Sequence, residues 1–139
     1  MTFKIRPAGK NDRKAILKVL KELDLFYPTL SLEGFWVAET DGKIVATLQL
    51  AEHEDFIFLG SLAVVKEEQG KGVGHALLEK VLRSCRKNIY LYTIIPDFFK
   101  KFGFRITAPV PGLPSKDRYE CEYCHPEKCV CMVRPPDVS

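Results

Sequence analysis

The sequence lacks any long uninterrupted apolar run. No window of the 139 residues approaches the roughly 18 apolar residues that a membrane-spanning helix needs. The N-terminal segment MTFKIRPAGKNDRK also lacks the apolar core of a secretory signal. The formal net charge of +3 is too small to indicate a nucleic-acid partner. These absences predict a cytoplasmic protein that acts on neither a membrane nor a nucleic acid.

The composition is that of an ordinary globular protein. Apolar residues make up 46% of the chain and charged residues 28%, and the length suits one domain with its own core. Apolar periodicity and turn signals predict five strands and three helices. The expected strands are 3–6, 35–40, 43–52, 56–66 and 88–94, and the expected helices are 11–25, 77–85 and 96–101. This order predicts an α+β fold on a mostly antiparallel sheet.

The segment EQGKGVGH, residues 68–75, places Gly70, Gly72 and Gly74 between an expected strand and an expected helix. A strand, a glycine-rich turn and a helix N-terminus bring free backbone N–H groups together, which is a ready anion site. The pattern is not a P-loop, and His75 stands where a dinucleotide fingerprint needs glycine. The remaining interpretations are a phosphate-binding loop, with Lys71 adding charge, and a plain tight turn.

Gln69-x-x-Gly72-x-Gly74 resembles the Q/R-x-x-G-x-G/A motif of the GNAT acetyltransferase superfamily. The preceding segment 61–65, SLAVV, looks like the central strand of that family, and 98–104, FFKKFGF, resembles its late "FYEKLGF" segment. The resemblance covers roughly residues 3–106. It implies a GNAT fold with splayed central strands in residues 1–106, with 107–139 as a Pro- and Cys-rich extension packed on the same domain.

The resemblance also implies that acetyl-CoA is the cosubstrate. The loop amides would hold its pyrophosphate, and the central strand would pair with its pantetheine arm. The implied binding residues are Leu62, Ala63, Val64, Gln69, Gly70, Lys71, Gly72, Val73, Gly74, His75 and Phe99. An N–H of the strand around Leu62 would stabilise the oxyanion that forms when an amine attacks the thioester.

The acid and base that many family members use are not found at the matching positions. The glutamate position is Phe58, and the tyrosine position is Phe99. Tyr92, on the strand after the helix, is the candidate acid. The acidic cluster 52–55 is either a substitute base or a solvated hairpin loop. With both reactants well placed, proximity would supply much of the rate and water would carry the protons.

Four of the five cysteines lie near the C-terminus, at Cys121, Cys124, Cys129 and Cys131. In a cytoplasmic chain, grouped thiolates more often bind metal than form a disulfide framework. A structural zinc site on these four residues is one interpretation. Free or partly oxidised thiols, and an iron–sulfur or regulatory role, are the alternatives.

Residues 92–99 and 116–124 are similar to a small stand-alone subset of the superfamily, related to the acetyltransferase part of N-acetylglutamate synthase and ending in a cysteine-bearing tail. Tyr119, where that subset has tryptophan, and His125 depart from its pattern. This narrower resemblance implies acetylation of a small-molecule amine such as the α-amine of glutamate, and the wider family implies a homodimer. The alternatives are a non-catalytic CoA-binding sensor with a metal- or redox-responsive tail, and a protein N-acetyltransferase.

Overall fold

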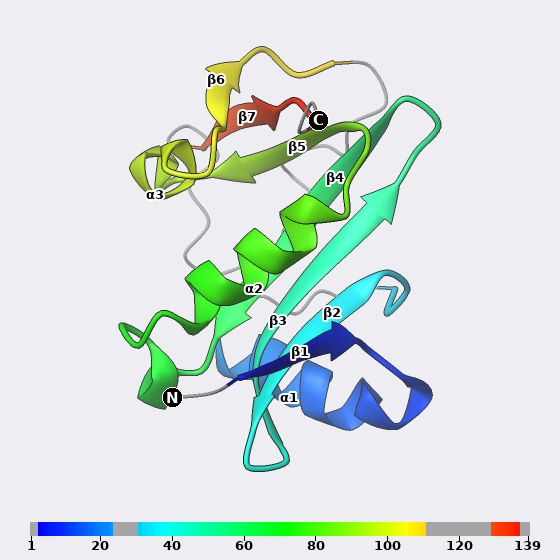
Figure 1. Cartoon of the computed structure of the whole chain (residues 1–139), viewed down its shortest axis with the longest axis vertical. Helices are drawn as coiled ribbons and strands as arrows, with labels where there is room; N and C mark the ends of the chain where they lie inside the picture. The colour runs from blue at the N-terminus through cyan, green and yellow to red at the C-terminus, as the bar shows by residue number, and fades with distance from the viewer. Residues whose placement is uncertain (1–2, 24–30, 111–128, 137–139) are drawn as a thin grey trace.

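The computed structural model describes residues 3–23, 31–110 and 129–136, and these residues form one twisted sheet with helices on both faces (Figure 1). The sheet has seven strands in the order β1-β2-β3-β4-β5-β7-β6. The strands are β1 (Lys4–Pro7), β2 (Phe35–Thr40), β3 (Lys43–Glu52), β4 (Phe56–Val64), β5 (Asn88–Thr93), β6 (Arg105–Thr107) and β7 (Val130–Arg134). All neighbouring pairs are antiparallel except β4 and β5. The predicted α+β class and mostly antiparallel sheet are confirmed.

Two longer helices cover the sheet, α1 (Arg13–Glu22) and α2 (Val73–Arg83). Both pack against β3 and β4, with α2 in front of the sheet and α1 behind it in Figure 1. The central stretch of β3, from Ile44 to Leu48, is accordingly buried on both faces. Helix α1 ends at Glu22, short of the predicted end near residue 25. None of the described helices has the length and apolar character needed to cross a membrane.

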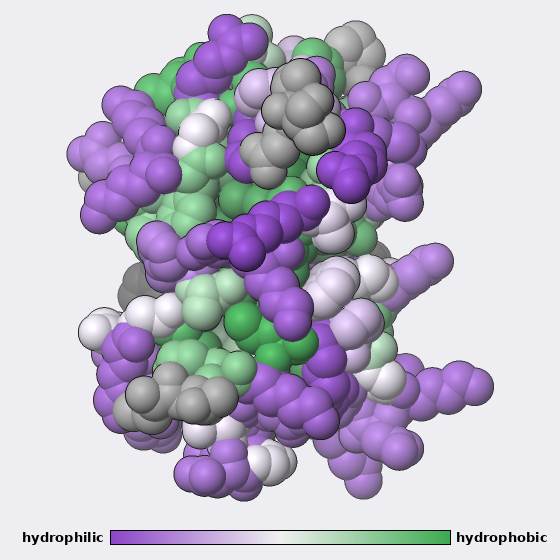
Figure 2. Space-filling view, viewed as in Figure 1, coloured by the Kyte–Doolittle hydropathy of each residue, from purple (hydrophilic) through white to green (hydrophobic). Residues whose placement is uncertain are grey.

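Short elements complete the chain. They are the 3₁₀ turns η1 (Lys10–Asp12) and η2 (Lys66–Glu68) and the helix α3 (Pro96–Lys100). The face seen in Figure 2 has hydrophilic residues along its rim and in a band across its middle, with hydrophobic patches above and below that band. The fully buried residues Leu48, Leu77, Ile89 and Met132 belong to one hydrophobic core that joins the sheet to its helices.

The hairpin between β2 and β3 turns where the sequence indicated. Asp41 and Gly42 have φ values of +52° and +75°, which is the pattern of a two-residue type I′ turn. The turn holds β2 and β3 in antiparallel register, with Thr40 opposite Lys43.

Strand β7 was not expected from the sequence. It comes from the C-terminal segment and lies between β5 and β6, so that Tyr92 is paired with Cys131 and Ile106 with Met132. The segment 107–139 therefore contributes a strand to the interior of the sheet.

Candidate functional site

Two glycines of the loop before α2 have left-handed backbone conformations. Gly70 has φ +81° and Gly72, the N-cap of α2, has φ +85°. A Cβ built on either residue would meet no atom within 4 Å, so the space beside both is open to a ligand. The glycines thus provide the turn and leave the backbone accessible at the same point.

Gly74 has a different role. A Cβ at this position would lie 3.3 Å from Cγ2 of Val64, which is tighter than ordinary packing. Gly74 therefore allows the first turn of α2 to approach the end of β4 closely. Of the three glycines, Gly70 and Gly72 clear the loop surface and Gly74 serves helix–strand packing.

The first turn of α2 carries backbone N–H groups that have no helical acceptor. The first N–H of the helix with a recorded helical acceptor is that of Ala76, which donates to the Gly72 carbonyl at 3.0 Å. Within the described residues, no backbone hydrogen bond is recorded for the N–H groups of Val73, Gly74 and His75, as expected for a first helical turn. These donors and the positive end of the helix dipole favour an anion.

Side chains of the loop brace it rather than fill it. Gln69 Nε2 donates to the Val64 carbonyl at 2.8 Å and ties the loop to the end of β4. Lys71 Nζ lies 3.6 Å from Glu68 Oε2, and the Lys71 side chain is 44% exposed. His75 lies 3.3 Å from Glu79 and against the ring of Phe102 at 4.8 Å.

Strands β4 and β5 part at the end of β4 that leads into the loop. Their parallel pairing covers three residue pairs, of which Phe58 with Tyr90 is the last. Beyond that pair, β4 continues through Leu62, Ala63 and Val64 with β3 as its recorded partner. The predicted splay of the central strands is confirmed. Backbone groups on the β5 side of this stretch are placed to pair with an extended ligand.

A bulge interrupts β4 within this stretch. Thr47 is opposite Ala63 and Gln49 is opposite Gly60, so one strand has an extra residue between the two pairs. Ser61 lies in the bulge with φ +53°. Gly60, which precedes Ser61, is a residue type often found at such a bulge, but the left-handed residue here is the serine.

An aromatic cluster lies on β4 and β5 beside the splay. The rings of Phe58 and Tyr92 are 5.5 Å apart in an edge contact, and Phe58 is buried. Burial raises the pKa of Tyr92, and the nearby Cys131 and Cys129 raise it further. Tyr92 therefore keeps its proton through neutral pH.

The remaining predicted site residues fall in different places. Phe99 is buried in the core, where it meets Phe98 and Phe104 edge-on. The acidic cluster 52–55 is exposed and lies before β4, about 26 Å along the strand from the loop. Its Glu52 pairs with Lys87 at 3.0 Å. The cluster is thus at the far end of β4 from the splay.

The cysteine site is only partly described. Cys131 is buried on β7 and Cys129 is half-buried just before that strand. Cys121 and Cys124 lie outside the described residues. Within the described ranges, no group of three or more His, Cys, Asp or Glu residues is placed to hold a metal ion.

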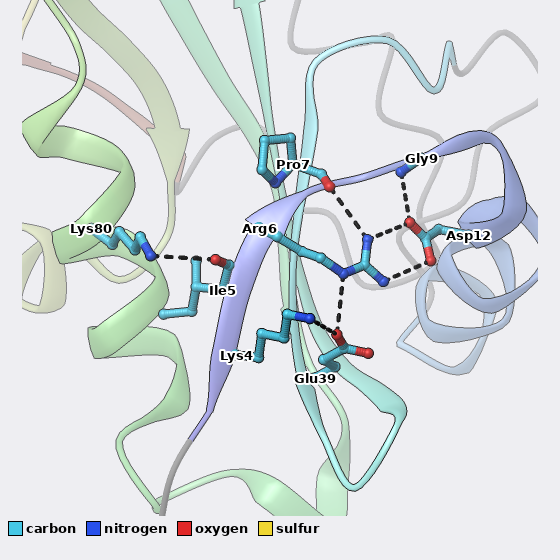
Figure 3. Close-up of polar contacts among 8 residues, drawn as sticks. All are labelled: Lys4, Ile5, Arg6, Pro7, Gly9, Asp12, Glu39 and Lys80. Carbon is cyan, nitrogen blue, oxygen red and sulfur yellow. Dashed lines mark hydrogen bonds and ion pairs between the residues drawn. The ribbon is translucent and has the colours of Figure 1, made fainter.

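The cation of Arg6 on β1 is engaged by two carboxylates. Figure 3 shows Arg6 with its guanidinium between Asp12 and Glu39. Arg6 Nη1 and Nη2 donate to the two carboxylate oxygens of Asp12 at 2.7 and 3.0 Å, and Nε donates to Glu39 at 3.1 Å. This network lowers the pKa of Asp12 to about 2. It joins β1 to β2 and to the turn before α1.

The family model and two curated relatives that match this chain all belong to one class of protein, the acetyltransferases. A family model described as "Acetyltransferase (GNAT) domain" matches residues 31–106. The chain is 30% identical over 111 residues to an uncharacterized N-acetyltransferase of Chlorobaculum tepidum, with 72% of this chain and 66% of the relative covered. It is 28% identical over 117 residues to an amino-acid acetyltransferase of Mycobacterium tuberculosis, with 77% and 64% covered. The chain thus spans slightly under two thirds of the length of these relatives.

Among solved structures, the chain resembles N-acetylglutamate synthase from Neisseria gonorrhoeae complexed with coenzyme A and L-arginine. The TM-score is 0.75 at 22% sequence identity, and the match covers 98% of this chain and 34% of that one. The likeness confirms the fold.

Proposed function

Because this chain belongs to the GNAT acetyltransferase family, we propose that it transfers the acetyl group of acetyl-CoA directly to the primary amine of a small molecule. The observation that carries the proposal is the conjunction of two features at one end of β4. The strand parts from β5 beyond Phe58, and it then leads into the open glycine loop at the N-terminus of α2.

The loop accounts for the pyrophosphate of the coenzyme. The N–H groups of Gly70 and of residues 72–75 would surround the phosphate oxygens, with the Cβ-free surfaces of Gly70 and Gly72 allowing close approach. The N–H groups of Gln69 and Lys71 instead donate to the carbonyls of Lys66 and Glu68, each at 3.4 Å. Lys71 would add a positive charge on the exposed side. The pantetheine amides would then pair with the backbone of β4 around Leu62 and Val64, on the side that β5 has left.

The chemistry needs little from side chains. The neutral amine attacks the thioester carbonyl, a C–N bond forms, and the C–S bond breaks as CoA leaves as a thiolate. The Leu62 N–H would stabilise the oxyanion between these events. Because Phe58 offers no base, water would take the proton of the amine. Tyr92, which holds its proton at neutral pH, would return one to the thiolate.

For the acceptor, we propose an amino acid, with glutamate as the first to test. One curated relative is named as an amino-acid acetyltransferase, which supports this class. The acceptor carboxylate would need a cation, and Arg6 is held by Asp12 and Glu39. Lys71 is paired with Glu68 and is proposed here for the phosphates, so Arg105, which is exposed, is the better candidate within the described residues.

The direct test is CoA formation from acetyl-CoA in the presence of the twenty amino acids and several polyamines. The CoA should be separated by chromatography, because the protein's own thiols react with thiol dyes. Turnover on one amine, with the acetylated product identified by mass, would establish the activity. Tight CoA binding without product from any amine would contradict it.

That contrary result would favour a second function, a non-catalytic CoA sensor. The observation behind it is that phenylalanines occupy both positions at which many family members have catalytic groups, and both Phe58 and Phe99 are buried. Because Cys129 and Cys131 lie near Tyr92, a change in the oxidation state of these thiols would then alter the surroundings of the proposed coenzyme site. CoA affinity that changes with oxidation of the protein would support this reading.

Zinc is proposed on the same thiols. Cys129 directly precedes β7 and Cys131 is its second residue, and both lie close enough to Tyr92 to raise its pKa. Alternate residues of a strand share a face, so both sulfurs can reach one ion. Cys121 and Cys124 would supply the other ligands. Measuring the metal content of the wild type and of Cys131→Ser would test the site, and an equal zinc content near zero in both would refute it.

A further inference from the structure

Thr47 is a buried polar residue beside the splay of the central strands. It lies on β3, its relative exposure is 0%, and the only other buried polar residue in the described part of the chain is Thr93. Its hydroxyl donates to the Ser61 carbonyl at 2.9 Å. A buried hydroxyl needs a partner, and here the partner is the bulge of β4.

The conformation that this hydrogen bond holds is an unusual one. Ser61 has φ +53°, and Asp41 in the β2–β3 turn is the only other described non-glycine residue with positive φ. A β-bulge with a left-handed residue usually has glycine there, because a Cβ makes this conformation unfavourable. Since serine occupies the position, contacts from the surrounding structure must stabilise the bulge.

Because the peptide bond is planar, the hydrogen bond to the Ser61 carbonyl also affects the direction of the Leu62 N–H. The Ser61 carbonyl and the Leu62 N–H belong to one peptide unit, and in a trans peptide they point in opposite directions. Because Thr47 on β3 holds the carbonyl, the N–H at the other end of this peptide unit would point away from Thr47. Strand β4 lies between β3 and β5, so an N–H directed away from β3 would face the side from which β5 has parted.

We propose that Thr47 is a positioning residue for acetyl transfer, which holds the Ser61–Leu62 peptide so that the Leu62 N–H faces the thioester carbonyl. The inference rests on the proposed function, since it gives the orientation of the donor that this function requires. Thr47 itself touches neither the coenzyme nor the acceptor. It acts through the backbone that it binds.

The test compares Thr47→Val with Thr47→Ser in the full-length protein. Valine has nearly the shape of threonine but no hydroxyl, whereas serine keeps the hydroxyl and loses a methyl group. For each variant, kcat and KM for acetyl-CoA would be measured with the best amine found for the wild type. The Kd for CoA, which has no acetyl group, and the thermal midpoint would be measured alongside.

We expect Thr47→Val to lower kcat at least about tenfold, because a displaced donor stabilises the oxyanion less. The KM for acetyl-CoA and the Kd for CoA should stay within about threefold, since the loop still holds the phosphates. Thr47→Ser should keep kcat near the wild-type value. A residue with only a structural role would lower the thermal midpoint in Thr47→Val and leave kcat unchanged.

The outcomes distinguish a failure of the role of Thr47 from a failure of the proposed acetyltransferase function. A folded Thr47→Val variant with kcat within twofold of an active wild type would overturn the role of Thr47 alone. A wild type that acetylates no amine would overturn the proposed function and this inference with it. If Thr47→Val does not fold, Thr47→Ala replaces it. The ratio of kcat between Thr47→Ser and Thr47→Ala then isolates the hydroxyl, and a ratio near one would refute the proposal.

Discussion

Replacing Gly72 by alanine separates the role of the loop in folding from its role in ligand binding. Gly72 has φ +85°, and an added Cβ would meet no protein atom within 4 Å. The cost to folding is therefore that of a left-handed backbone, about 1 kcal/mol. For a domain of this length, that free energy lowers the thermal midpoint by about 3–5 °C.

Gly42 provides the matched control. It lies in the turn between β2 and β3 with φ +75°, and an added Cβ there also meets nothing within 4 Å. Gly42→Ala should therefore lower the thermal midpoint by the same amount as Gly72→Ala. Only the methyl group at Gly72 lies among the N–H groups of the loop, so only Gly72→Ala should weaken CoA binding, by at least about tenfold.

The measurements are thermal unfolding without ligand and calorimetric titration with CoA. Equal losses of thermal midpoint combined with a loss of affinity in Gly72→Ala alone would match the reasoning. Wild-type affinity in Gly72→Ala would show that the phosphates lie elsewhere. A similar loss of affinity in Gly42→Ala would show that stability, and not the loop, governs binding.

Two further predictions concern pH. The pKa of Asp12 falls from 3.8 to about 2 beside Arg6, so its stabilisation is complete above pH 4 and is lost as the pH falls through 2. Asp12→Asn should lower the free energy of unfolding by about 1 kcal/mol at pH 7, after solvent screening is allowed for. In urea unfolding at pH 7, 4 and 2.5, the free energy of unfolding of the variant should depend less on pH than that of the wild type. Parallel pH dependences in the two proteins would contradict this. Burial, with Cys131 and Cys129, raises the pKa of Tyr92 from its usual value of 10. The contribution of the Tyr92 hydroxyl to the stability of the folded protein is therefore complete below pH 10 and is lost as the pH rises through the pKa of the folded state. Tyr92→Phe should remove that alkaline loss and lower kcat at pH 8 by about 10²-fold, and an unchanged kcat would exclude Tyr92 as the acid.

The parts of the fold that the sequence predicted are those with local signals. The pair Asp41-Gly42 predicts the hairpin turn, because both residue types tolerate positive φ. The structure shows the two positive φ values that a type I′ turn requires. Pro96 opens α3 and Gly103 follows its end with φ +91°. The glycine loop is predicted in the same way, since the phosphate contacts proposed for it all lie within one short segment.

The parts that were missed depend on contacts between distant segments. Strand β7 has few residues and follows a segment rich in proline and cysteine. The residues Val130–Arg134 carry no local signal that they pair with β5, some forty residues earlier in the chain. The engagement of Arg6 likewise depends on Glu39, which only the antiparallel register of β1 and β2 brings near. Periodicity within a segment cannot report such partners.

This division also explains why the coenzyme was easier to infer than the acceptor. The proposed coenzyme site is a loop and a helix start that are contiguous in sequence. The proposed reacting end is assembled from β3, β4, β5 and β7, through Thr47, Ser61, Tyr92 and Cys131. In our proposal, the direction of one N–H there depends on a hydrogen bond between residues fourteen positions apart. Since a shift of about 1 Å in such a donor is enough to change a rate strongly, the proposed chemistry would depend on the sheet register as much as on the motif.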